Sequence, residues 1–178
     1  QWDRPPLLPV RWDCSPLFDS LQDQRSRIAS YALESAWVDK DPRLCITYPA
    51  YLHILLRRIP LLVALREPLS VAISLHARNG FSFNSGLVLW WIYNYHIASQ
   101  LCSTDLLVPY SALLMMDEHG LQKLFGPFLE FHNHQRPSID LAQDLIASFL
   151  KPEYNRSSGP LNSGDRARLN PNLLNICQ

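Results

Sequence analysis

The stretch from Leu61 to Ser74, LLVALREPLSVAIS, decides the fold class of this chain. Its apolar beginning, Pro60–Leu65, shows no alternation, which predicts a strand covered on both faces. Arg66 ends the apolar run, and Pro68 follows at a position that suits the first turn of a helix. We therefore expect a central strand that delivers Arg66 to its carboxyl end, where open α/β sheets bind their ligands.

The helix that begins at Pro68 should end at Asn79-Gly80, because glycine is a natural C-terminal cap. Ser74 falls on a different face of this helix from the apolar residues. The apolar face has helical spacing and should lie against the sheet; its residues are Leu69, Ala72, Ile73 and His76.

The rest of the chain predicts an α/β fold with a mostly parallel sheet covered by helices, because strands and helices alternate along it. Residues 1–14 should be irregular and residues 151–178 a loop-rich tail that docks through Leu173-Leu174, all within a single domain over 1–178. The remaining expected elements are a helix over Pro16–Glu34, a short strand at Trp37-Val38, a helix after a break at Pro49, a helix from a cap at Asn84 or Ser85 to about Leu101, a strand over Asp105–Tyr110, and helices around His119–Phe131 and Ser138–Leu150.

Composition narrows the classes of function. The formal net charge is +0, so a broad surface for nucleic acid is not expected and any anion site must be local. No apolar run is long enough to span a bilayer, and no signal peptide is visible. The cysteines are far apart in the sequence, which favours reduced, mostly buried thiols in a cytoplasmic protein. His132-Asn133-His134 has no third ligand at a suitable spacing, so a polar loop is expected there and no metal site.

Three residues should meet at one edge of the sheet, because each follows an expected strand: Lys40, Arg66 and Tyr110. Arg66 and Ser74 together form a suitable grip for a phosphate, since a guanidinium binds two oxygens and the helix N-terminus adds free N–H groups. The alternative is an Arg66 paired with Glu67 or Asp41, and a Ser74 bonded to its own backbone. The two readings are equally compatible with the pattern.

The segment Arg66-Glu67-Pro68-Leu69-Ser70-Val71-Ala72-Ile73-Ser74 resembles the 3′-phosphate-binding motif of sulfotransferases that use 3′-phosphoadenylyl sulfate (PAPS) as donor. Lys40-Asp41-Pro42-Arg43 resembles a block found in bacterial members of that family. The resemblance extends over roughly Trp12 to Leu150. It implies a P-loop-NTPase-like three-layer sandwich, with PAPS as the cofactor and no metal.

By this resemblance, Arg66 and Ser74 would bind the 3′-phosphate of the donor, and Tyr110 would pack beside the nucleotide. Lys40 would lie near the transferring sulfuryl group and act in catalysis by stabilising the bridging oxygen. Alternatively, Tyr110 is an aromatic residue at the rim of the core, and Lys40 forms a surface ion pair with Asp39 or Asp41.

The resemblance lacks one part of the family pattern. The loop of small residues that holds the 5′-phosphosulfate has no counterpart, because no glycine occurs before Gly80. We therefore expect that an N-terminal strand–helix unit is missing from these residues. Two functions follow: transfer of a sulfuryl group from PAPS to a hydroxyl of a carbohydrate or small metabolite, or a non-catalytic remnant that keeps the fold as an interaction module.

Overall fold

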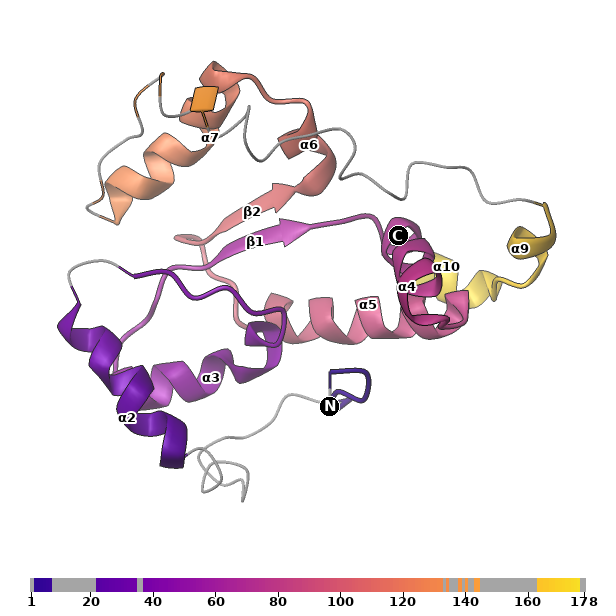
Figure 1. Ribbon diagram of the computed structural model, residues 1–178, viewed down its shortest axis with the longest axis horizontal. Coiled ribbons are helices and arrows are strands. Elements are labelled where there is room, and N and C mark those ends of the chain that lie inside the picture. Colours follow the sequence, from indigo (N-terminus) through magenta and orange to yellow (C-terminus); the bar gives the residue numbers. More distant parts are fainter. Residues whose placement is uncertain are drawn as a thin grey trace. The chain divides into compact units, whose positions relative to one another are not determined.

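The computed structural model describes residues 2–7, 22–34, 37–132, 134, 138, 140, 143–144 and 163–176, and these form an α/β structure (Figure 1). Helices alternate with two strands, as the sequence pattern predicts. The elements are α2 (Gln22–Ser30), the 3₁₀ helix η2 (Tyr31–Leu33), α3 (Leu44–Leu55), β1 (Leu62–Leu65), α4 (Pro68–Asn79), α5 (Phe83–Ala98), β2 (Leu106–Pro109), α6 (Tyr110–Leu114), α7 (Glu118–Phe131), α9 (Ser163–Ala167) and α10 (Pro171–Ile176).

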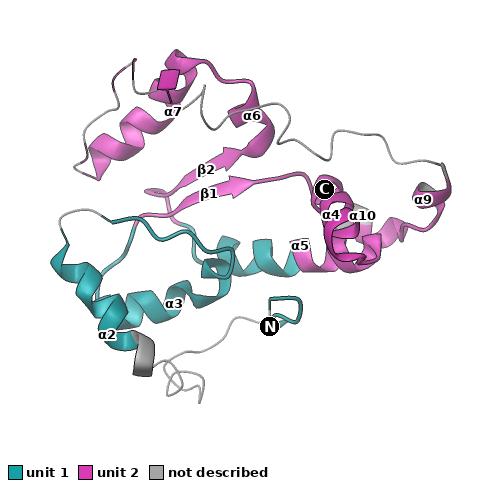
Figure 2. Ribbon diagram, viewed as in Figure 1, with its two compact units in different colours: residues 1–59, 91–101 teal, residues 60–90, 102–178 magenta. Residues whose placement is uncertain are grey.

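The chain divides into two compact units, coloured separately in Figure 2. Unit 1 comprises residues 1–59 and 91–101, and unit 2 comprises residues 60–90 and 102–178. Helix α5 begins in unit 2 and ends in unit 1. The expected single domain stays a prediction, and each unit is described by itself below.

Unit 2 contains a two-stranded parallel sheet, visible as two arrows of the same direction in Figure 1. The register pairs Leu62 with Leu106 and Leu65 with Pro109. The prediction of a strand covered on both faces is wrong for β1. Leu62 is 48% exposed and Ala64 is also exposed, whereas the residues between and after them are half-buried. A continuous apolar run alone therefore overstated how far the strand is covered.

The predicted order of a strand before Arg66 and a helix from Pro68 to Asn79 is confirmed. Pro68 is the first residue of α4, and Gly80 ends the helix with a left-handed φ of 71°, which glycine adopts at little cost. Ala72 is buried against the core as expected. The placement of His76 on the apolar face is wrong: His76 is exposed, and its Nδ1 lies 2.7 Å from the carbonyl oxygen of Phe81. An imidazole can bond a nearby carbonyl, which an aliphatic residue at that position would not do.

Helix α5 begins one residue before its predicted caps. The Ser82 hydroxyl accepts a hydrogen bond from the Ser85 backbone N–H at 3.1 Å, so Ser82 caps the helix, and neither Asn84 nor Ser85 does. Gly86 permits a close crossing of α5 over α4, because a Cβ added there would lie 2.7 Å from the Ala72 Cα. The core of unit 2 forms at this crossing, around Ala72, Phe83 and Leu87, with Ile73, Trp90, Leu169 and Leu173 packed against it. The expected docking of the tail through Leu173 is confirmed.

In unit 1, helix α3 runs through Pro49, so the predicted break there is wrong. The helix buries Tyr48 and Ala50 on either side of the proline, and this burial outweighs the lost backbone bond. The core of unit 1 is formed by Ile28, Tyr51 and Leu55, with Tyr31, Trp37, Leu44, Ile54 and Ile59 packed against it.

The short strand predicted at Trp37-Val38 is also wrong, because residues 37–40 have irregular backbone. Trp37 instead stacks on Tyr31 with ring centroids 4.8 Å apart, and Val38 is 94% exposed. Trp37 therefore packs against a helical cluster and Val38 faces solvent, so neither residue enters a sheet.

The remaining expectations fall on helices and cysteines. The predicted helix over Pro16–Glu34 is confirmed from Gln22, while residues 16–21 and most of Ser138–Leu150 lie outside the described residues. Cys45 is half-buried and Cys102 exposed, and both are free thiols, so the expectation of mostly buried thiols fails for Cys102. Burial raises the pKa of the Cys45 thiol to about 11, which makes it a poor nucleophile at neutral pH.

Candidate functional site

The carboxyl ends of β1 and β2 bring Arg66 and Tyr110 together. Each residue directly follows its strand, and the register that pairs Leu65 with Pro109 continues outward to these two side chains. The Arg66 guanidinium carbon lies 4.9 Å from the centre of the Tyr110 ring. A guanidinium held over an aromatic face gains a cation–π interaction. The site is therefore a positive charge at the carboxyl edge of a two-stranded parallel sheet.

The backbone at Arg66 is held by a third residue. The indole Nε1–H of Trp90 donates a hydrogen bond to the Arg66 carbonyl oxygen at 2.7 Å, in a partly buried position. Trp90 lies on α5, whose crossing with α4 forms the core of unit 2. The turn between β1 and α4 is thus connected directly to the core.

Helix α4 presents its N-terminus at the same edge. Its first backbone bond joins the Val71 N–H to the Glu67 carbonyl at 3.1 Å, so the N–H groups of Leu69 and Ser70 precede the helical ladder. The Glu67 side chain makes no capping bond. Ser74 lies further along α4, half-buried, two turns after the proline. The N-terminus, Arg66 and Ser74 all belong to one strand–helix unit, as the sequence predicts.

Asp105 fixes the opposite, amino end of the two strands. Its carboxylate accepts hydrogen bonds from the Leu61 N–H at 3.0 Å and from the Cys102 N–H at 2.9 Å. Nearby, the Nε2 atom of the His132 ring lies 3.0 Å from the Thr104 carbonyl oxygen. Of these bonds, the one from the Leu61 N–H links the residues that precede β1 and β2, and so joins the amino ends of the two strands. The sequence offered no signal for this role of Asp105.

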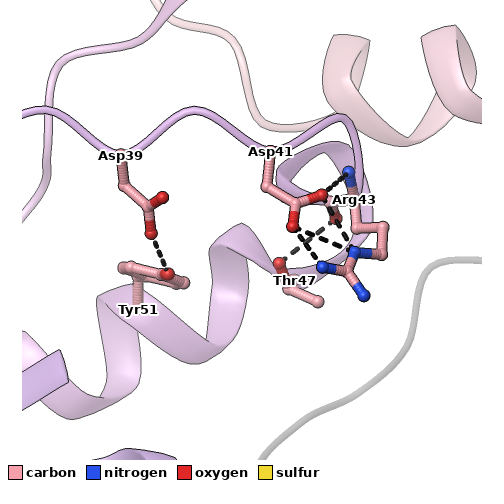
Figure 3. Close-up of polar contacts among 5 residues, drawn as sticks. All are labelled: Asp39, Asp41, Arg43, Thr47 and Tyr51. Atoms are coloured by element: carbon pink, nitrogen blue, oxygen red, sulfur yellow. Dashed lines mark hydrogen bonds and ion pairs between the residues drawn. The ribbon is translucent and has the colours of Figure 1, made fainter. Parts of the chain in front are cut away.

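Lys40 belongs to unit 1, where it lies exposed in the loop that leads into α3. The expected position of Lys40 beside Arg66 and Tyr110 required a strand at Trp37-Val38, and residues 37–40 have irregular backbone. Figure 3 shows the neighbouring carboxylates engaged elsewhere: Asp39 accepts from the Tyr51 hydroxyl, and Asp41 pairs with Arg43.

Asp41 precedes helix α3, which begins at Leu44, and binds Arg43 in several ways. Its Oδ1 accepts from the Arg43 backbone N–H at 2.8 Å and from Nε at 2.9 Å, and its Oδ2 pairs with the guanidinium (Figure 3). The hydrogen bonds from Arg43 hold the pKa of the Asp41 carboxyl below its ordinary value. This carboxylate therefore stays ionised and is occupied by its ion pair with Arg43.

In unit 1, the side chain whose pKa departs furthest from its ordinary value is Tyr51. Burial, and then its hydrogen bond to Asp39, raise the pKa of the Tyr51 hydroxyl above its ordinary value. Burial also raises the pKa of Tyr93, whose hydroxyl donates to the Trp2 carbonyl at 2.8 Å. Both tyrosines are neutral donors that hold loops to helices, so neither is prepared to act as a base.

No protein-family model, no curated protein and no solved structure matches this chain. Within the part of the chain that the structure describes, no three His, Cys, Asp or Glu side chains are grouped so as to hold a metal ion. Among the described helices, none is long and apolar enough to cross a membrane. The strand ends of unit 2, with Arg66 and Tyr110, are therefore the candidate site.

Proposed function

We propose that this protein binds the 3′-phosphate end of PAPS through Arg66, Ser74 and Tyr110. The single observation that carries the proposal is the Arg66–Tyr110 pair at the carboxyl ends of two parallel strands. A ligand at this edge would meet a guanidinium for a phosphate and an aromatic ring for a nucleoside in one place. The spacing of Arg66, Pro68 and Ser74, which resembles the sulfotransferase motif, supports the same ligand.

Three groups would share the phosphate. The Arg66 guanidinium offers a fork of donors, the α4 N-terminus offers backbone N–H groups and a favourable dipole, and the Ser74 hydroxyl offers one more donor. The chain has a net charge of +0, so these local donors and no general positive field would select the anion. A phosphate contacted in this way orients the whole nucleotide.

The reaction that we propose is transfer of the sulfuryl group from PAPS to a hydroxyl of a carbohydrate or small metabolite. It would take place on a P-loop-NTPase-like three-layer sandwich, by in-line displacement that relies on positioning and charge stabilisation. Lys40 is the proposed catalytic cation, and no metal is part of the mechanism. The protein is proposed to be cytoplasmic.

Calorimetric titration with 3′,5′-adenosine bisphosphate tests the binding step. We expect the wild type to bind and Arg66→Ala to bind roughly tenfold to a hundredfold more weakly, because a charge-assisted hydrogen bond contributes about 1.5–3 kcal/mol. Arg57→Ala is the matched control, since Arg57 is an exposed arginine of unit 1. Absence of binding by the wild type, or equal losses in the two variants, would contradict the proposal.

The second candidate is a binding module without transferase activity. The observation that favours it is the absence of glycine before Gly80, which leaves residues 1–79 without a glycine-rich loop for a 5′-phosphosulfate. Incubation with radiolabelled PAPS and a panel of sugar acceptors separates the two functions. Bound nucleotide without labelled product on any acceptor would favour the module, whereas labelled product that disappears in Lys40→Ala would favour the enzyme.

A further inference from the structure

We propose that Trp90 is a positioning residue of the Arg66 site, acting on the ligand only through the Arg66 backbone. This inference rests on the proposed function, since it assigns a new residue to the same anion site. Its basis is the 2.7 Å bond from the Trp90 Nε1–H to the Arg66 carbonyl oxygen.

The bond determines the orientation of one peptide plane. In a trans peptide the C=O and the following N–H point in opposite directions. With the Arg66 carbonyl held on Trp90, the Glu67 N–H points away from the indole, and the carbonyl dipole is kept occupied. A carbonyl that rotated toward the anion would repel it, because oxygen lone pairs and phosphate carry the same sign of charge. Trp90 thus excludes the orientation that would oppose binding.

Trp90 is itself held by the core of unit 2. It packs against the cluster of Ala72, Phe83 and Leu87, which Leu169 and Leu173 of the C-terminal segment also contact. A side chain that is anchored in this way loses little further entropy when its N–H makes a bond. The indole is therefore a fixed donor, which is what a positioning group requires.

Trp90→Phe removes the donor and keeps an aromatic ring, and Trp91→Phe is the matched control. Trp91 is the next residue of α5, is exposed, and stacks on Tyr95 at 5.3 Å. We expect Trp90→Phe to bind 3′,5′-adenosine bisphosphate about fivefold to tenfold more weakly, corresponding to one hydrogen bond. Trp91→Phe should bind like the wild type. Trp90→His, which keeps a ring N–H, should recover part of the affinity and serves as the second variant if phenylalanine impairs folding.

A double-mutant cycle with Arg66→Lys separates positioning from a general loss of structure. If Trp90 holds the Arg66 backbone, losing its bond also displaces the guanidinium. Adding Trp90→Phe to Arg66→Lys, which has no guanidinium to displace, should therefore cost less than it does in the wild type. Additive losses, or a Trp90→Phe affinity within twofold of the wild type, would overturn the inference while leaving the proposed function in place. Failure of the wild type to bind would overturn the proposed function and the positioning role with it.

Discussion

Arg66 is held in position by residues that lie far from it in the sequence. Its guanidinium lies over Tyr110 and its carbonyl accepts from Trp90. The positions of Arg66 and Tyr110 could be predicted, because each follows an apolar run that ends in a polar or aromatic residue. The role of Trp90 could not, because a tryptophan on an apolar helix stripe is equally suited to packing alone.

The raised pKa of Tyr51 leads to a prediction about the stability of the protein at alkaline pH. Its pKa is raised in the folded protein, by burial and by the bond to Asp39, from an unfolded value near 10.0. The folded state therefore binds the proton more tightly, and this stabilisation is present below pH 10 and is lost as pH rises above it. Tyr51→Phe should be less stable than the wild type at pH 8, and its free energy of unfolding should fall less steeply above pH 10.

Urea denaturation at several pH values on both sides of about 10, the ordinary pKa of tyrosine, measures the free energy of unfolding of both proteins. Tyr95→Phe is the control, since Tyr95 is 42% exposed on α5. It should follow the wild-type decline. Parallel declines in Tyr51→Phe and the wild type would refute the role assigned to Tyr51.

At the scale of elements, helices α4 and α5 pack closely because Gly86 of α5 has no side chain. Helix α4 was predictable from Pro68 to Gly80, since both ends carry residues with strong backbone preferences. Helix α3 was not, because the burial of its apolar residues overrides the proline within it. The closeness of the α4–α5 crossing also had no local signal, because Gly86 resembles any other glycine in a helix.

Gly86→Ala should destabilise the protein by roughly 1–3 kcal/mol, the usual cost of overpacking a dense core. The added Cβ would lie 2.7 Å from the Ala72 Cα, which is backbone and cannot move without shifting the helix. Thermal unfolding measures the effect. Gly80→Ala is the contrast: no atom lies within 4 Å of its new Cβ, so only its left-handed φ of 71° opposes the change. A Gly86→Ala variant as stable as the wild type would exclude the close crossing.

At the scale of the whole molecule, contacts between distant parts of the sequence close unit 2. The Asn84 side chain donates to the Arg168 carbonyl at 3.1 Å and accepts from the Asn170 N–H at 2.9 Å. Leu169, between these two residues, packs against the core. The tail was expected to be loop with one docking point, and the structure adds α9, α10 and this two-point attachment.

Asn84→Ala should release this attachment and increase tryptic cleavage after Arg168 severalfold, because a protease needs a locally unfolded segment. Mass spectrometry of timed digests measures the rate at that bond. Ser85→Ala is the control, since the Ser85 hydroxyl bonds to the nearby Ser82 hydroxyl at 2.7 Å. Equal cleavage rates in the two variants would show that Asn84 does not hold the segment.

Local residue patterns were sufficient to predict the unit of strand, turn and helix from Leu61 to Gly80, because apolar continuity, proline and glycine act on the backbone within a few residues. They also predicted that Arg66 stands at a strand end. Three contacts became visible only in the folded protein: the Arg66 guanidinium over Tyr110, the Trp90 bond to the Arg66 carbonyl, and the Asp105 bond that joins the amino ends of the strands. These contacts join residues that are far apart in the chain, and such pairings depend on how the elements pack, which local preference does not encode.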